Sequence, residues 1–158
     1  MRVLVLLALI AGLPSAAFAD DPLDQRWGVT VWGLSYHVNK SIDYATNNWG
    51  LGLRYYVVRR HLFVEADALR NSNRGLVVPV SAGAEFGVGH IGACRLGGIA
   101  AFTAAYYQNP RKEKTEVKVG PVPGISVGFG HLKTNVVAVL SKSDRPLAAI
   151  AASLTVLF

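Results

Sequence analysis

The sequence contains a single cysteine, Cys94, and only 16% of its 158 residues are charged. One cysteine excludes a fold held by intramolecular disulfide bonds. Beyond residue 19, no uninterrupted apolar stretch reaches the length of about 18 residues that a membrane-spanning helix requires. No run of Lys and Arg exceeds two residues, which argues against nucleic acid as a partner. No metal-ligand spacing is present, so no metal site is expected.

The N-terminal segment has the features of a secretory signal peptide. Arg2 precedes the apolar run Val3–Leu13, and Ala17-Phe18-Ala19 forms a small-x-small cleavage signature. The apolar run is too short for a membrane anchor, which needs about 20 residues. We therefore expect cleavage after Ala19, with residues 1–19 as the signal peptide and residues 20–158 as one domain.

The exported chain is predicted to be all-β. Hydrophobic residues make up 51% of the sequence. With helices excluded, a closed barrel is the other structure that satisfies every backbone group in lipid. Short alternating segments separated by polar, Gly or Pro residues are typical of such barrels. We therefore predict an eight-stranded antiparallel transmembrane β-barrel, with strands at 27–38, 49–58, 62–71, 76–87, 93–107, 120–129, 132–141 and 147–158.

Loop lengths and the last strand indicate a location in the outer membrane of a Gram-negative bacterium. The connections after the second, fourth and sixth strands are tight, whereas the others, at 39–48, 72–75, 108–119 and 142–146, are mostly longer. Short periplasmic turns and long extracellular loops are the usual arrangement in these barrels. The last strand alternates apolar residues and ends at Phe158, which resembles the C-terminal signature of outer-membrane proteins.

Alternation along each strand predicts which side chains face the lumen. In the first strand Trp32, Leu34 and Tyr36 are expected to face lipid, and His37 to face inward. The periplasmic half of the lumen should hold three positive and three negative charges, which buried side chains tolerate chiefly as hydrogen-bonded pairs. This predicted network comprises Arg54, Glu65, Asp67, Glu85, Arg95 and Lys133.

The extracellular half of the lumen is predicted to be lined by small or apolar residues. Gly50, Gly52, Ser81, Gly83 and Ala105 are among the inward positions there. A narrow apolar cavity open to the outside would suit a hydrocarbon chain, since eight-stranded barrels can hold one small ligand. The alternative is that neighbouring large side chains fill this space.

In order and spacing, four segments resemble the lipid A palmitoyltransferases, a family of eight-stranded outer-membrane enzymes that move a palmitoyl group from a phospholipid to lipid A. The resemblance covers most of the exported chain. It rests on Tyr36-His37, Arg70-Asn71-Ser72, Gly83-x-Glu85 and the segment Pro121-Val122-Pro123-Gly124-Ile125-Ser126-Val127-Gly128-Phe129-Gly130. It implies a phospholipid donor, lipid A or lipopolysaccharide as acceptor, no cofactor, and a monomer in the outer membrane.

The resemblance also implies roles for individual residues. His37 and Ser72 match the catalytic histidine and serine, and Asn71 stands where the family usually has aspartate. Gly83 resembles the small residue at the base of the acyl pocket, which measures chain length. Pro121 and Pro123 resemble strand prolines that interrupt the hydrogen-bond ladder and admit lipid sideways. Because Asn71 cannot ionise, and residues 20–26 are too few for the family's N-terminal helix, the chain would be a divergent member.

Chemical reasoning on the same residues is independent of the family. His37 and the Asn71-Ser72 pair both follow upward strands, so they share the extracellular rim. Acyl transfer needs a base, a hydroxyl and donors for the oxyanion, which His37, Ser72 and Asn71 respectively can supply. Asp43 is a candidate to orient His37. The alternative is that a rim histidine is only an interfacial residue and that Asn-Ser-Asn-Arg-Gly is an ordinary turn.

Two other functions compete with acyl transfer. A lipid A deacylase would use His and Ser close together on one strand, but this sequence has no His-x-Ser arrangement. A structural or adhesin barrel would have a lumen that is polar throughout, whereas small and apolar residues are predicted for the outer half. Arg111, Lys112 and Lys114 in the longest predicted loop either attract lipid A phosphates or form a solvated loop.

Overall fold

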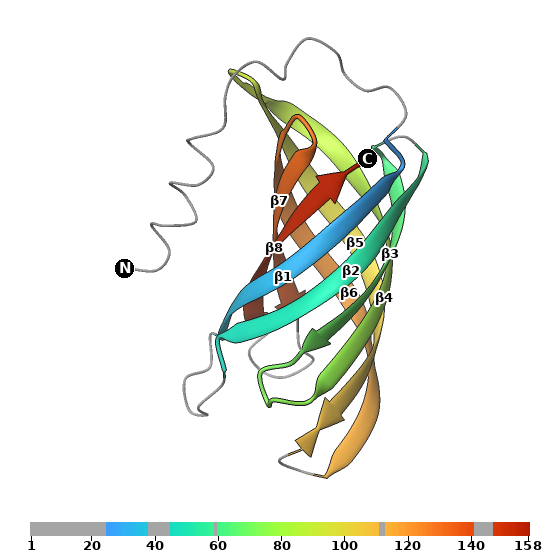
Figure 1. Ribbon diagram of the computed structural model, residues 1–158, viewed down its shortest axis with the longest axis vertical. Helices are drawn as coiled ribbons and strands as arrows, with labels where there is room; N and C mark the ends of the chain where they lie inside the picture. The colour runs from blue at the N-terminus through green and yellow to red at the C-terminus, as the bar shows by residue number, and fades with distance from the viewer. Residues whose placement is uncertain (1–24, 38–44, 59, 111–112, 141–146) are drawn as a thin grey trace.

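The computed structural model describes residues 25–37, 45–58, 60–110, 113–140 and 147–158. They form a closed barrel of eight antiparallel strands, in which each strand pairs with the next and β8 pairs with β1 (Figure 1). The predicted fold class is confirmed. Within these ranges no helix is long and apolar enough to cross a membrane. The strands are β1 (Trp27–His37), β2 (Asn47–Val58), β3 (Leu62–Arg70), β4 (Leu76–Ile91), β5 (Cys94–Asn109), β6 (Lys114–Phe129), β7 (Leu132–Leu140) and β8 (Leu147–Leu157).

We call the half of the barrel that contains Trp27 and Phe158 the terminal half, and the half that contains His37 and Ser72 the loop half. Trp27 and Phe158 exchange two backbone hydrogen bonds, of 3.2 and 2.9 Å, so the two ends of the described barrel meet. In Figure 1 the terminal half is at the top. The predicted signal peptide lies outside the described residues.

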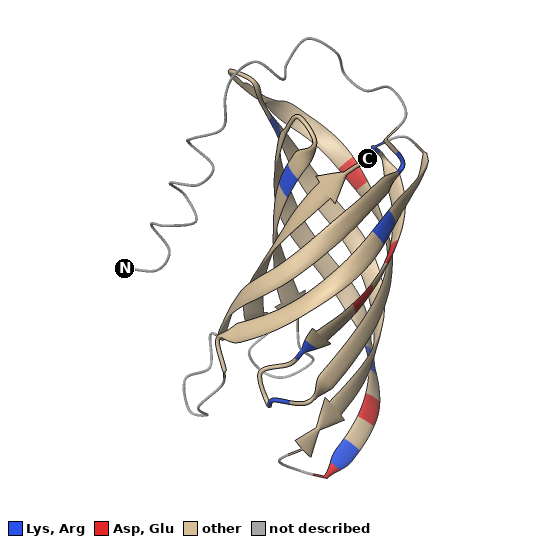
Figure 2. Cartoon of the chain, in the orientation of Figure 1, with Lys and Arg blue, Asp and Glu red and all other residues tan. Residues whose placement is uncertain are grey.

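The strand boundaries differ from the prediction mainly in the β5–β6 hairpin. A loop was expected at 108–119, but β5 continues to Asn109 and β6 begins at Lys114. The alternation of charged and β-branched residues from Lys114 to Val119 continues the strand pattern, because outside the barrel wall neither face has to be apolar. Glu113 adopts a φ of 47° in the turn. Figure 2 shows blue and red positions gathered at the end of this hairpin. Arg111 and Lys112 lie outside the described residues.

The outward face of the barrel is apolar and exposed. Leu51 is 62% exposed and Val80 55% exposed, although both lie in the middle of strands. Alternate residues point inward, as the sequence pattern predicts, and many of them are polar or small. The exposed outward residues include Val29, Leu34, Tyr36, Trp49, Leu51, Leu53, Val64, Val80, Phe102, Ile125, Leu154 and Val156.

One orientation in β1 was predicted wrongly. Trp32 points inward, and its Nε1 donates a 2.8 Å hydrogen bond to Asp67 Oδ1. The register of β1 with both neighbours shifts between Trp32 and Leu34, and opposite β8 it accommodates one extra residue at Gly33. A bulge of this kind breaks the strict alternation of side chains. Trp32 and His37 therefore both point into the barrel, although they are five positions apart.

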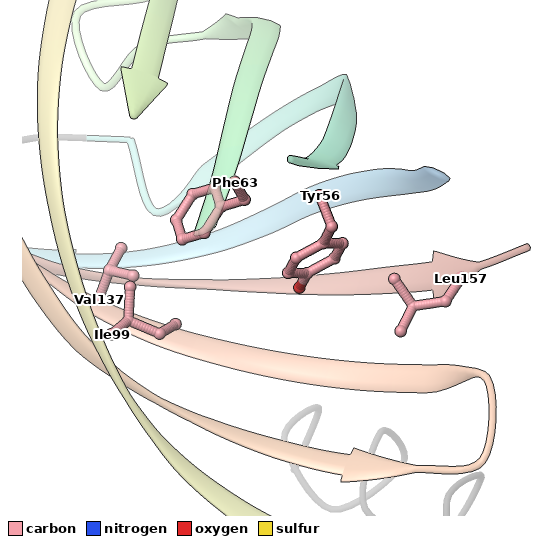
Figure 3. Close-up of a cluster of buried hydrophobic side chains, with 5 residues drawn as sticks. All are labelled: Tyr56, Phe63, Ile99, Val137 and Leu157. Atoms are coloured by element: carbon pink, nitrogen blue, oxygen red, sulfur yellow. The ribbon is translucent and has the colours of Figure 1, made fainter. Parts of the chain in front are cut away.

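An apolar cluster fills part of the lumen in the terminal half. Figure 3 shows side chains from five strands pointing into the barrel. The rings of Tyr56 and Phe63 meet edge to face, with centroids 6.1 Å apart. Trp32, Ala101, Val122 and Ala151 pack against the cluster. Its buried members are Tyr56, Phe63, Ile99, Val137 and Leu157.

A buried ionic network lies beside this cluster. Arg54 donates to Glu65 Oε2 at 2.6 Å and to Glu85 Oε1 at 2.8 Å. Lys133 pairs with the other oxygen of Glu85 and donates to Tyr56 Oη at 2.8 Å. Since each buried charge has a charged or hydrogen-bonding partner, the cost of burying the set is offset. The prediction is thus confirmed for Arg54, Glu65, Glu85 and Lys133.

Two members of the predicted network behave differently. The carboxylate of Asp67 is buried but accepts its hydrogen bond from Trp32. Arg95 is exposed, so its placement in the network was wrong. In the strand register Arg95 lies opposite His90 and Gly128, near the terminal ends of β4 and β6. Arg95 therefore stays exposed although the alternation along β5 assigns its side chain to the inward face.

Candidate active site

His37 and Ser72 meet at the rim of the loop half. His37 ends β1 and points inward because of the bulge at Gly33. Ser72 follows β3 in the turn that leads to β4 and is 6% exposed. His37 Nε2 lies 2.5 Å from Ser72 Oγ. A serine hydroxyl in hydrogen-bond contact with an imidazole nitrogen is the arrangement of a base-activated nucleophile. The structure thus brings together two residues that the sequence analysis singled out.

The backbone and the hydroxyl of Ser72 are both held. Its carbonyl oxygen accepts a 3.0 Å hydrogen bond from the backbone N–H of Ala45. Its hydroxyl oxygen accepts one of 3.1 Å from Asn48 Nδ2, which also donates to Ser35 Oγ at 2.6 Å. A continuous hydrogen-bonded chain therefore runs from Ser35 through Asn48 and Ser72 to His37.

Asn71 does not touch His37 in this arrangement. Its Oδ1 accepts hydrogen bonds from the backbone N–H groups of Asn73 and Gly75, at 2.9 and 3.1 Å. Its Nδ2 donates to the carbonyl oxygens of Leu76 and Gln108. This is the Asx-turn behaviour expected of Asn in a tight turn. Asn71 fixes the turn that presents Ser72, and its amide hydrogens are already engaged.

Gly83 lies against the buried aromatic cluster. A Cβ built there would be 2.8 Å from Phe63 Cζ and 2.7 Å from Ala101 Cβ. Gly83 is therefore covered by the ring of Phe63. A side chain at position 83 would have to displace that ring.

Several inward-facing residues of the loop half keep accessible surface. They contrast with the terminal half, where Thr30, Arg54 and Tyr56 are at most 3% exposed. The inward side chains near the rim are therefore on average less buried than those around Arg54, although Val77 and Ala149 are buried as well. The partly exposed inward positions include Ser35, Asn48, Pro79, Ser81, Thr103, Ala105 and Val122.

The ladder between β6 and β7 is incomplete beside Pro121 and Pro123. In the described residues β6 pairs with β7 from Phe129 only as far as Gly124, opposite Val137. On its other side β6 pairs with β5 past both prolines. A proline has no N–H to donate, so their missing donors fall on the edge that faces β7. Both proline rings point outward.

Two features of the site escaped the sequence analysis. Asn48 is 24 positions from Ser72 in the chain, and its only sequence signal is a polar residue at the start of an apolar strand. The second feature is that the ladder between β3 and β4 also lacks pairs at Asp67 and Ala68, opposite Pro79 and Val78. Asp43, the proposed partner of His37, and the loop residues Arg111 and Lys112 lie outside the described ranges.

Comparisons with known proteins give similarity to solved structures. No family model and no curated protein matches the chain. The outer membrane protein Ail of Yersinia pestis, solved in a phospholipid bilayer nanodisc, is similar with a TM-score of 0.43 and 12% identity. The match covers 85% of this chain and 100% of that one. These values do not bear on what the chain binds or catalyses.

Proposed function

We propose that the protein is an outer-membrane acyltransferase that moves a palmitoyl chain from a phospholipid to lipid A. The observation that carries the proposal is the contact of 2.5 Å between His37 Nε2 and Ser72 Oγ at the rim of the loop half. The family resemblance supplies the substrates, and the geometry supplies the chemistry. Gly83, Pro121 and Pro123 would guide the donor.

The outward surface supports a membrane location. A soluble monomer rarely exposes contiguous apolar patches above a few hundred Å². Here apolar side chains such as Leu51, Phe102 and Ile125 cover the outside of strands spread around the barrel. An outward apolar band with a polar interior is the pattern of transmembrane barrels. With the predicted signal peptide, the loop half would face the cell exterior, where lipid A is found.

The proposed reaction is an exchange of esters. The ester of the phospholipid breaks, and a new ester forms on a hydroxyl of lipid A. His37 Nε2 accepts a proton from the attacking hydroxyl and returns it to the oxygen of the departing lysophospholipid. Ser72 either carries the acyl group in between or polarises the donor carbonyl. In the direct route the proton of the acceptor hydroxyl ends on the lysophospholipid. In the covalent route the lysophospholipid takes the Ser72 proton and the acceptor proton restores the Ser72 hydroxyl, so both routes balance without a cofactor.

The donor chain would lie in the loop half of the lumen. Partly exposed inward residues such as Ser81, Ala105 and Val122 leave room below the rim. The phospholipid would reach this space through the β6–β7 edge next to Pro121 and Pro123, where the ladder stops. The end of the chain would meet Phe63 over Gly83, which would set the preferred length.

The deciding experiment is a mass spectrum of lipid A from cells that express the wild-type chain, His37→Ala or Ser72→Ala at matched outer-membrane levels. The expected result is a gain of one palmitoyl group that both variants abolish. A gain that survives both substitutions would refute the assignment of the site. Loss of an acyl group from lipid A would identify a deacylase instead.

A non-enzymatic barrel is the second candidate. The buried network of Arg54, Glu65, Glu85 and Lys133 favours it, since a sealed polar interior is sufficient for a structural or adhesin barrel. Under this alternative His37 and Ser72 would only stabilise the rim. An unchanged lipid A profile under several growth conditions, with the barrel folded, would support it over acyl transfer.

A further inference from the structure

Asn48 donates a hydrogen bond to the hydroxyl oxygen of Ser72. It is the second residue of β2, and its side chain points inward between Ser35 and Ser72. The Asn side-chain amide carries two hydrogens. One is donated to Ser35 Oγ at 2.6 Å and the other to Ser72 Oγ at 3.1 Å. The amide therefore reaches both serines through donors alone.

This contact limits the directions in which the Ser72 hydroxyl can donate its hydrogen. A hydroxyl has one hydrogen to donate and two lone pairs to accept with. Because Asn48 Nδ2 can only donate, the Ser72 oxygen accepts there and its hydrogen is available for the contact of 2.5 Å with His37 Nε2. When that hydrogen is donated to His37, Nε2 is the unprotonated nitrogen. That is the state in which the imidazole can remove the serine proton.

We propose that Asn48 is a positioning residue that directs the Ser72 proton onto His37 Nε2; this rests on the proposed function for its use in catalysis. Asn48 Oδ1 is buried and has no hydrogen-bond partner in the described part of the chain. A buried acceptor without a partner carries a free-energy cost. We attribute this cost to the orientation of the Ser35 and Ser72 hydroxyls, which the two hydrogen bonds donated by Asn48 fix.

The substitution Asn48→Asp tests the proposal because it reverses the hydrogen bond with little change of shape. A carboxylate is an acceptor only, so the Ser72 hydroxyl would donate to it and accept from His37 Nε2–H. The matched control is Asn47→Asp, which adds the same charge at the adjacent, exposed position. Asn48→Leu removes the donors without adding a charge. Gel mobility of the folded barrel shows whether each variant assembles.

The first measurement is the tautomer of His37 in the isotope-labelled barrel in detergent micelles, by ¹⁵N NMR above the pH at which His37 protonates. We expect the proton on Nδ1 in the wild type and in Asn47→Asp, and on Nε2 in Asn48→Asp. A proton on Nε2 in the wild type, or the same tautomer in both chains, would overturn the proposal. This result does not depend on whether the barrel is an enzyme.

The second measurement is the rate of acyl transfer as a function of pH. Misorientation of a reacting group can lower kcat by about 10²-fold, and we expect this for Asn48→Asp with KM unchanged. The added charge stabilises the imidazolium, so the acidic limb of the pH profile moves to higher pH. Asn48→Leu should lower kcat without that movement. Wild-type kinetics in Asn48→Asp, with His37→Ala inactive, would refute the role of Asn48 alone.

The two measurements separate the failure of one proposal from the failure of the other. If the wild type transfers no acyl group but the tautomers switch as expected, the proposed function fails and the positioning of Ser72 stands. If acyl transfer requires His37 and Ser72 but the tautomers do not switch, the function stands and the proposal for Asn48 fails.

Discussion

The two halves of the lumen differ in what their inward side chains do. In the terminal half, large residues such as Arg54, Tyr56 and Phe63 are at most 3% exposed and form an ionic and aromatic plug. In the loop half, small residues such as Ser81 and Ala105 keep accessible surface below the His37–Ser72 pair. One barrel wall therefore supports two interiors, the first suited to stability and the second to a ligand. Substitutions in one half should leave the property of the other unchanged.

The largest expected effect on stability comes from Glu85→Ala in the terminal half. Glu85 accepts from both Arg54 and Lys133, so its removal leaves two buried cations with reduced compensation. Loss of one partner of a buried pair typically costs about 3–5 kcal/mol. We expect this decrease in the free energy of unfolding in urea, with unchanged acyl transfer per folded barrel. Glu116→Ala, which breaks exposed ion pairs with Lys114 and Lys118, is the control and should leave unfolding unchanged.

His37→Ala in the loop half should lower activity and leave stability unchanged, which is the converse of Glu85→Ala. Loss of the base should reduce the rate of acyl transfer by about 10²–10⁴-fold. The His37 side chain is half-exposed and makes little contribution to packing, so the urea midpoint should stay near that of the wild type. A loss of activity that merely parallels a loss of folded barrel would contradict the separation of the two halves. The measurement is therefore the initial rate per folded molecule.

A smaller effect should come from Phe63→Leu at the boundary between the halves. The Phe63 ring covers Gly83. The Cζ atom of the Arg54 guanidinium lies 4.4 Å from the centre of the same ring. Truncation should lengthen the preferred donor chain and destabilise the barrel by about 1–2 kcal/mol. Gly83→Met should act in the opposite direction and favour shorter donors. Competition between phospholipids of different chain length, read by mass spectrometry, compares the two; an identical product profile would remove both residues from the acyl site.

The smallest effect is expected from Pro121→Ala combined with Pro123→Ala. Alanine restores two N–H donors on the β6 edge that faces β7. If donor lipid passes through this edge, acyl transfer should slow by a few fold while the acyl-chain preference stays unchanged. Ile125→Ala, on the same outward face but within the paired part of β6, provides the control. Equal rates in all three proteins would exclude access at this edge.

The sequence predicted the barrel because alternation is a local property of each strand. All eight strands and the outward positions of β2 and β3 followed from it. The errors arose where alternation was assumed to continue unchanged. The bulge at Gly33 turned Trp32 inward, and the extension of β5 and β6 beyond the barrel wall turned an expected loop into a hairpin. Alternation also predicted that Arg95 faces the inside of the barrel, but its position near the start of β5 leaves it exposed.

The site was predictable only in part, for a related reason. His37 and Ser72 carry side chains with recognisable chemistry, and both follow strands that run in the same direction. The contact of Ser72 with Asn48 depends on the stagger between strands, which no single segment of sequence specifies. The identity of residue 71 as asparagine does not show whether its side chain stabilises a turn or takes part in a reaction. Its four hydrogen bonds to backbone groups became visible only with the turn itself.

The pairing of β1 with β8 has a consequence for how the chain folds. Val29 lies opposite Val156, and Trp27 bonds to Phe158, so these contacts join residues separated by almost the whole length of the described chain. Contacts of such long range form slowly, because the loop entropy is lost before they contribute. Until β8 arrives, β1 and β7 each present an unpaired edge that can recruit another strand. The pairing of β8 with β1 is therefore the folding step at which closure of the monomer and aggregation compete for the same backbone hydrogen-bonding groups.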